Sequence, residues 1–238
     1  INQFNRLNHR NEIYFALFRP DERPSWPGNL KKYRLRESDN AIVDDSDPPI
    51  LAVNPDTGFF SDTAQSYWSI AVDGKEVDEG GAASKLPSYS SRNVYTYYSG
   101  SASTTLSNSA NAVATTNSAL SASKFGVTSG ERDNLINWIR GQDVDDTDGD
   151  TITAEDRYLM GDPLHSKPIA ITYGGTEAEP DITVYYGTNS GVLHAVNADT
   201  GVEQFAFLPE DMFDEQKGLR ANSIAQSHID GIDGSVTP

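Results

Sequence analysis

The residues of this sequence best suited to chemistry are seven carboxylates gathered in one short segment. The segment 141–156 contains no Lys, Arg or His, and its acids are Asp143, Asp145, Asp146, Asp148, Asp150, Glu155 and Asp156. Like charges this close repel one another unless a cation lies among them. Aspartates alternating around a glycine also supply the oxygen-rich geometry of a calcium loop. An acidic run is equally typical of a solvated surface loop, so the neighbouring sequence has to decide.

Two registers of an EF-hand-like loop are compatible with this segment, and neither fits the template fully. A loop beginning at Asp146 places acids at positions 1, 3 and 5 and the carbonyl of Ile152 at position 7, but Arg157 then stands where a bidentate acid belongs. A loop beginning at Asp145 places Asp156 at position 12 but loses an oxygen ligand at position 5. The predicted ligands of a Ca²⁺ ion are therefore Asp143, Asp145, Asp146, Asp148, Asp150, Ile152, Glu155 and Asp156, with the choice among them open.

A short amphipathic helix is predicted to lead into the acidic segment, as the first helix of an EF-hand does. Thr128 and Glu131 have the spacing of a capping box. Apolar residues then recur at spacings of three and four over 135–139, and Gly141 stands where a helix commonly ends. This context favours a metal loop over a merely solvated one.

Composition excludes several classes of function. The chain has 238 residues, 18 Lys and Arg against 35 Asp and Glu, and a net charge of −17. This charge argues against nucleic acid and anionic membranes as partners, because both attract basic surfaces. Without cysteine there is no disulfide, thiol nucleophile or Cys-ligated zinc. No membrane span or targeting segment is evident, and because the chain begins at Ile1 and ends in what looks like the start of a strand, we expect a piece of a larger protein.

The elements around the acidic segment are predicted to be mainly β. Apolar and aromatic runs predict strands at 13–18, 29–35 (with one wet face) and 93–98. Four more, at 168–173, 181–186, 192–196 and 204–208, are separated by Gly- and Asp-rich turns, as in one blade of a propeller. Between these groups, residues 99–123 are rich in Ser and Ala and uncharged, which predicts a flexible surface loop.

Several motifs in order resemble one known family. The stretch 186–201, with its Asn-Ala-Asp-Thr-Gly turn, resembles the blade motif of quinoprotein-like propellers. The stretches 26–35, 80–83, 92–97, 137–143, 160–168 and 230–235 together resemble the C-terminal domain of PilY-type type IV pilus tip adhesins, over nearly the whole chain except the Ser/Ala-rich segment.

The resemblance implies both a fold and a role. The fold would be a partial, modified β-propeller, divided into a first β-rich part (1–98), the flexible loop (99–123), the helix with its calcium loop (124–162) and blade strands on which the chain ends (163–238). The role would be that of a calcium-binding pilus tip adhesin and assembly factor at the bacterial outer surface, acting in attachment, pilus extension and retraction, and twitching motility. Its partners would be minor pilins of the tip complex and a host or abiotic surface receptor.

An enzymatic alternative is a quinoprotein-like dehydrogenase fragment. Phe205 stands where that blade motif usually carries Trp, the chain has no vicinal cysteines, and one clear repeat is visible. The four histidines have no spacing typical of a metal site or catalytic triad, and His165 and His194 are predicted to be hydrogen-bonded core or blade-face residues in strands. We therefore expect a protein that is not an enzyme.

Overall fold

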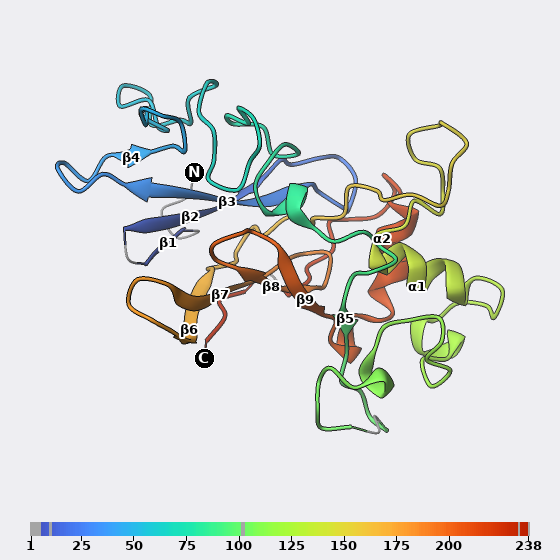
Figure 1. The fold of residues 1–238 in the computed structure, drawn as a ribbon. Helices are drawn as coiled ribbons and strands as arrows, with labels where there is room; N and C mark the ends of the chain where they lie inside the picture. The colour runs from blue at the N-terminus through green and yellow to red at the C-terminus, as the bar shows by residue number, and fades with distance from the viewer. Residues whose placement is uncertain (1–5, 10, 101–102, 233, 238) are drawn as a thin grey trace.

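Two β-sheets and two short α-helices make up the fold (Figure 1). The structure is a computed structural model, and it describes residues 6–9, 11–100, 103–232 and 234–237. The first sheet is built from the N-terminal strands, whereas the second gathers β5 from the middle of the chain and four strands from its last third. The prediction of a mainly β protein is confirmed.

The first sheet has the order β1-β2-β3-β4, all antiparallel, with strands β1 (Arg6–His9), β2 (Glu12–Phe18), β3 (Gly28–Leu35) and β4 (Ile42–Val43). Strands β2 and β3 are the two predicted from apolar runs. The prediction that β3 has one solvent-exposed face is wrong, since every residue from Gly28 to Tyr33 is buried. One face of the sheet packs on the second sheet, and loops 44–75 cover the other.

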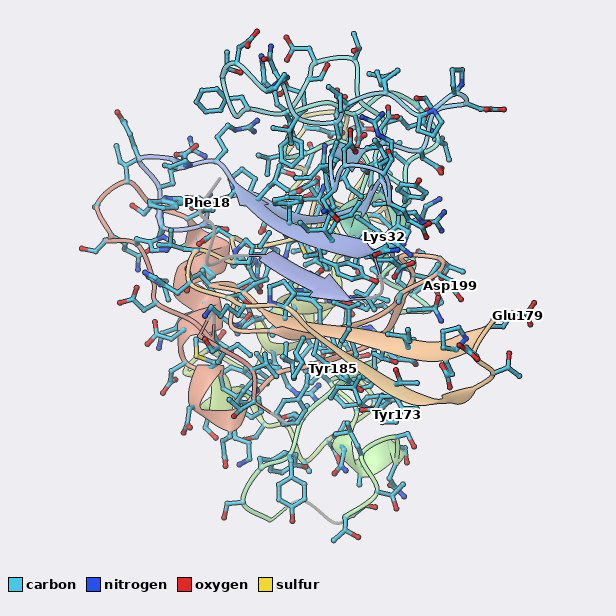
Figure 2. All side chains as sticks on the ribbon, turned by 90° about the vertical axis from the view of Figure 1, so that its left-hand side faces the viewer. Phe18, Lys32, Tyr173, Glu179, Tyr185 and Asp199 are labelled. Atoms are coloured by element: carbon cyan, nitrogen blue, oxygen red, sulfur yellow. The ribbon has the colours of Figure 1, made fainter. Side chains whose placement is uncertain are left out.

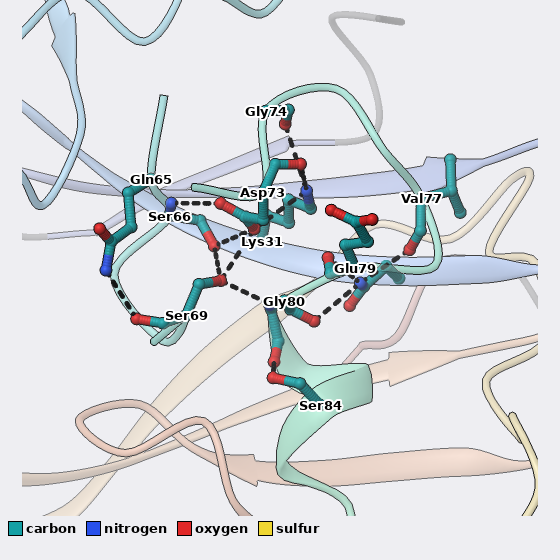
Figure 3. Close-up of polar contacts among 12 residues, drawn as sticks. Lys31, Gln65, Ser66, Ser69, Asp73, Gly74, Val77, Glu79, Gly80 and Ser84 are labelled. Atoms are coloured by element: carbon teal, nitrogen blue, oxygen red, sulfur yellow. Dashed lines mark hydrogen bonds and ion pairs between the residues drawn. The ribbon is translucent and has the colours of Figure 1, made fainter. Parts of the chain in front are cut away.

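A buried ion pair explains how Lys31 is accommodated in the covered face of β3 (Figure 3). Its ammonium lies 3.0 Å from Asp73 Oδ2 and donates to the carbonyls of Asp73 and Gly74, so all three N–H groups have a partner. Ser66 and Ser69 donate their hydroxyls to the same Asp73 oxygen at 2.7 and 2.8 Å. Because burial of an unpaired charge is costly, this network fixes the 66–74 loop on the strand.

The second sheet has the order β5-β9-β8-β7-β6. Its strands are β5 (Val94–Tyr95), β6 (Ile169–Gly175), β7 (Pro180–Gly187), β8 (Leu193–Asn197) and β9 (Glu203–Phe207). The last four form the consecutive antiparallel meander that the sequence predicts. The strand expected at 93–98 is only two residues long, and it adds to the sheet in parallel with β9.

The two sheets pack on each other through alternate residues of β7. Ile182, Val184 and Tyr186 enter the core that also contains Tyr14 and Leu30 of the first sheet. The turn between β8 and β9 adds a polar contact, since Lys32 Nζ and Trp68 Nε1 both donate to the carbonyl of Ala198, at 2.8 and 3.2 Å. Figure 2 shows Lys32 beside this turn and Tyr173 with Tyr185 on the opposite side of the second sheet.

Helices α1 (Arg132–Arg140) and α2 (Glu215–Ala221) lie side by side at one end of the second sheet (Figure 1). The predicted apolar stripe of α1 is buried, and Gly141 ends the helix with φ 113°. The capping box is wrong: the helix begins at Arg132 with Glu131 as N-cap and no side-chain cap bond, because Thr128 lies one turn too early. Neither helix is long and apolar enough to cross a bilayer.

The Ser/Ala-rich segment differs from the surface loop that was expected. Val113 and Leu120 are fully buried in the same core as α1, and Asn111 is buried as well. Side chains donate hydrogen bonds to backbone carbonyls of this segment. Asn117 donates to the carbonyls of Ala110 and Ala112, and Arg132 donates to three more. Short 3-10 helices at Ala82–Lys85, Ser109–Asn111, Ala122–Phe125 and Glu210–Met212 complete the described elements.

Candidate metal centre

The acidic loop is held at both ends by backbone and side-chain bonds. The N–H of Asp143 donates to the carbonyl of Glu155 at 2.9 Å, and the N–H of Arg157 donates to that of Gly141 at 2.9 Å. Gln142 Nε2 adds a bond of 2.7 Å to the carbonyl of Thr153. The helix that ends at Gly141 and the strand-like segment after Glu155 therefore fix where the loop begins and ends.

Within this frame, five of the predicted ligands converge in two overlapping groups. Asp143, Asp148 and Glu155 each offer a carboxylate oxygen, and these oxygens lie within 4.8 Å of one another. Asp146, Asp148 and Asp150 form a second group by the same measure. Because Asp148 belongs to both, it lies at the centre of the acidic cluster. Either group could hold a metal ion.

Two oxygens of the first group are buried and unsatisfied. The side chain of Asp143 is 3% exposed, and its Oδ2 accepts from the N–H and hydroxyl of Thr147 at 2.9 and 2.7 Å. Its Oδ1, like Oε1 of Glu155, has no hydrogen-bond partner among the described residues. A buried polar atom left unpaired costs about 1–3 kcal/mol, and more for a charged group. A hard cation accepts such oxygens as ligands, so the donor set fits Ca²⁺.

The electrostatics of the loop agree with this geometry. The pKa of Glu155 is raised, first by its loss of solvent and then by the charges of Asp150, Asp148, Asp143 and Asp146. The loop is folded by its own short turns: Asp146 Oδ1 accepts from the N–H of Thr151 at 3.0 Å, and Asp150 Oδ1 from that of Ile152 at 2.7 Å. The carboxylates are thus brought together by the backbone against their mutual repulsion.

The other three predicted ligands, Asp145, Ile152 and Asp156, belong to neither of the two groups. Asp145 is bound by Arg220 of α2 through two hydrogen bonds of 2.6 and 2.8 Å, which lowers its pKa. Asp156 accepts from the N–H of Tyr89 at 2.6 Å and from the hydroxyl of Ser88 at 3.2 Å. Ile152 belongs to the exposed tip of the loop, where its N–H bonds to Asp150 and its side chain is 51% exposed.

Sequence reasoning does not identify Thr147 and Arg220 as parts of this site. Thr147 orients Asp143, and Arg220 reaches Asp145 and Glu131 from 75 and 89 residues away. Thr147 is four residues after Asp143, which is not the two-residue spacing of an Asx turn, so the local sequence gives no signal for this contact. Nothing in the sequence around Arg220 indicates its partner, since that contact depends on how α2 packs on α1.

A second buried charge cluster lies beside α1, where Arg92 binds Glu203 through bonds of 2.6 and 3.0 Å and donates to the carbonyl of Ile139. His194 shares Glu203, with Nδ1 2.7 Å from its Oε1. The core role predicted for His194 is confirmed. The prediction that His165 lies in a strand of the core is wrong, because His165 is exposed and lies in a turn after Gly161.

Comparison with known proteins gives one partial match. Part of the chain is similar to the type IV pilus biogenesis factor PilY1 of Pseudomonas aeruginosa strain UCBPP-PA14, with 32% identity over 104 residues. The match covers 35% of this chain and 8% of that protein. The chain matches no known protein-family profile. No solved structure matches it either. This chain is therefore related in part to a type IV pilus protein and spans a small share of its length.

Proposed function

We propose that this chain is a calcium-stabilised part of a surface protein associated with type IV pili, and that it acts in attachment and pilus extension or retraction without being an enzyme. One observation supports the metal above all: Asp143 and Glu155, which form a group with Asp148, each keep a buried oxygen without a hydrogen-bond partner among the described residues. A bound Ca²⁺ would satisfy both atoms and offset the repulsion among the acids. The pilus role rests on the partial similarity to PilY1.

The first shell that we propose consists of Asp143, Asp148 and Glu155, with Asp146 and Asp150 completing it from the loop. Asp143 is fixed before any ion arrives, because Thr147 holds its other oxygen. The exposed members bring flexibility, since Asp148 and Asp150 lie at the loop surface. A shell with one fixed and several adaptable oxygens is suited to Ca²⁺ rather than to Mg²⁺, which demands rigid octahedral geometry.

The propeller architecture belongs to the same proposal, and the outer face of the second sheet supports it. Rings of Tyr173, Tyr185, Phe205 and Tyr95 follow one another across this face at centroid distances of 6.5, 6.3 and 6.3 Å. Ala195 pairs with both Tyr185 and Phe205, and its small side chain lets the two rings meet above β8. A half-exposed aromatic face of this kind suits packing against a further sheet, as between propeller blades.

The experiment that tests the metal is a thermal melt of the purified chain with 2 mM EDTA and with about 5 mM CaCl₂. If Ca²⁺ binds the folded loop, the melting temperature rises by several degrees, because a ligand present at 100 times its Kd stabilises by about 2.7 kcal/mol. Terbium luminescence excited through Trp138, four residues before Gln142, reports binding independently of stability.

Asp148→Asn should abolish most of the calcium shift, because Asp148 contributes to both groups. Asp181→Asn removes the same charge from an exposed position on β7 and should leave the shift unchanged. A wild-type melt that does not respond to calcium, together with no terbium signal, would refute the metal site. Equal responses of the two variants would place the ion elsewhere on the chain.

A further inference from the structure

A pocket of about 750 Å³ lies beside the acidic loop, between α1, α2 and the segment that leads into β3. Its walls come from segments 23–27 and 127–138, from Asp145, Thr147 and 157–160, and from segment 217–222. Of the proposed metal-shell residues, none lines it. A volume of this size is typical of sites for small organic ligands, which usually occupy 300–1,000 Å³. The pocket is therefore a candidate site distinct from the metal centre.

The charge of the pocket is opposite to that of the chain. Arg23, Arg157, Lys217 and Arg220 line it, against the two acids Glu131 and Asp145, whereas the whole chain carries −17. Both acids form their ion pairs with the same guanidinium, that of Arg220, and within the described residues neither acid forms an ion pair with Arg23, Arg157 or Lys217. The ion pair that Lys217 forms among the described residues is a long one, 3.8 Å to Asp214 outside the pocket. An anion is therefore attracted here and repelled by most of the surrounding surface.

The apolar part of the pocket is rigid and partly aromatic. Leu135, Met160 and Leu219 are almost fully buried and form part of its lining. The Trp26 ring is stacked on His228 at 4.1 Å between centroids, and the guanidinium of Arg157 lies 4.0 Å above the Trp138 ring. The two indole rings in the lining, Trp26 and Trp138, favour a ligand with a flat apolar body.

Two lining residues also have hydrogen-bond donors without a partner. The indole Nε1–H of Trp26 and the Nε–H of Arg157 are buried and make no hydrogen bond within the described part of the chain. The His228 ring that supports Trp26 is itself fixed, because its Nδ1 lies 2.9 Å from the carbonyl of Pro24 and its Nε2 3.1 Å from Asn189. Each unpaired donor carries a desolvation cost that an acceptor on a ligand would recover.

We propose that this pocket binds a small organic carboxylate with a flat apolar body. The carboxylate lies near Lys217, Arg157 and Arg23, and the apolar body lies against Trp26 and the buried side chains of the floor. The size of the pocket fits a ligand of this class, and the strongly acidic surface around it disfavours a polyanion such as nucleic acid. The site is distinct from the metal shell, because none of the five shell acids lines it.

The test uses indole-3-acetate and its neutral isostere indole-3-acetamide, titrated into the ¹⁵N-labelled chain. The three tryptophans give three indole N–H signals, and Trp26→Phe identifies that of Trp26. The expected result is a saturable shift of the Trp26 signal with indole-3-acetate, and at least about tenfold weaker binding of the amide. An unmoved Trp26 signal, or equal binding of acid and amide, overturns the proposal.

A matched pair of variants separates the pocket from general charge effects. Lys217→Gln removes a pocket cation, whereas Lys75→Gln removes a comparably exposed one that pairs with Asp62 elsewhere. Lys217→Gln should weaken indole-3-acetate binding about threefold to fivefold, as expected for one partly exposed charge, and Lys75→Gln should leave it unchanged. Equal affinities in the two variants overturn the assignment to this pocket. Repeating the titration in EDTA and in CaCl₂ keeps this result separate from that of the metal site.

Discussion

The N–H of Asp143 donates to the carbonyl of Glu155 across 2.9 Å, so two acids twelve residues apart are fixed side by side. Their carboxylates lie in the same group with Asp148, and one oxygen of each is buried without a partner. Without an ion, repulsion in this group is opposed by these backbone bonds and by the hydrogen bonds from Thr147 to Asp143. The loop is therefore arranged for a cation by the bonds at its ends rather than by a complete EF-hand pattern.

Arg220 is expected to compensate one acid at the edge of the loop. Arg220→Met would leave Asp145 and Glu131 without their shared cation and add a free charge beside the metal group. We expect a lower melting temperature in EDTA and a larger rise on adding calcium than in the wild type, because more repulsion is then relieved by the ion. Thermal melts in both buffers measure this.

The control for that variant is Arg36→Met, which breaks an exposed ion pair with Asp39 in the first sheet. Arg36→Met should change the melting temperature by no more than about two degrees, because exposed pairs contribute about 0–1 kcal/mol. It should leave the calcium response unchanged. A calcium shift in Arg220→Met no larger than that of the control would contradict the link between α2 and the loop.

Two glycines with the same backbone angle test the docking of the β8–β9 turn. Gly201 and Gly58 both have φ 73°, but an added Cβ would lie 2.5 Å from the Trp68 ring at Gly201 and meet nothing within 4 Å at Gly58. Gly58→Ala should cost about 1–2 kcal/mol for the left-handed conformation alone. Gly201→Ala should cost a further 1–3 kcal/mol, because the ring has to move. Urea unfolding of both variants checks the difference, and equal losses would be inconsistent with the contact.

The buried pair of Arg92 and Glu203 should be far more important to stability than an exposed pair. Both side chains are 1% exposed, so Arg92→Met leaves a carboxylate uncompensated in the core and should cost about 3–5 kcal/mol. Arg19→Met removes the exposed partner of Asp78 and should cost less than about 1 kcal/mol. Similar unfolding free energies for the two variants would argue against a charged pair in the core.

The free energy of unfolding should fall in two stages as the pH is lowered. Burial lowers the pKa of His194, so the unfolded chain takes up a proton below about pH 6.5 that the folded chain resists. Burial alone would raise the pKa of Glu203, but the charge of Arg92 and hydrogen bonds from His194 and Arg92 outweigh it and lower the value to about 2. Stability is therefore lost again as the pH falls from about 4.5 towards 2.

Unfolding free energies measured at intervals of about one pH unit from pH 8 down to about pH 2.5 follow both stages. Each group contributes a slope of up to about 1.4 kcal/mol per pH unit within its own window. His194→Gln should remove the first stage, which begins below about pH 6.5, and leave the second. An unchanged slope between pH 7 and 5 in this variant would assign the first stage to another group.

The sequence by itself determines the local elements of this protein. Apolar and aromatic runs between turn residues locate β2, β3 and the β6–β9 meander. An apolar helical stripe followed by Gly141 locates α1 and its end. These patterns depend on neighbours within a few residues. The density of acids in 143–156 likewise indicates the loop with a metal-compatible cluster. These signals are local in origin.

Only the tertiary structure decides which acids meet. Asp145 is closer in sequence to Asp148 than Asp143 is, and Asp156 directly follows Glu155, yet Asp145 is bound by Arg220 and Asp156 by the 88–89 turn. The burial of Val113 and Leu120 and the pocket between α1 and α2 are equally unpredictable from composition. The physical reason is that a carboxylate or methyl group is satisfied by whatever lies nearest in space. That neighbour is set by packing between segments far apart in the chain.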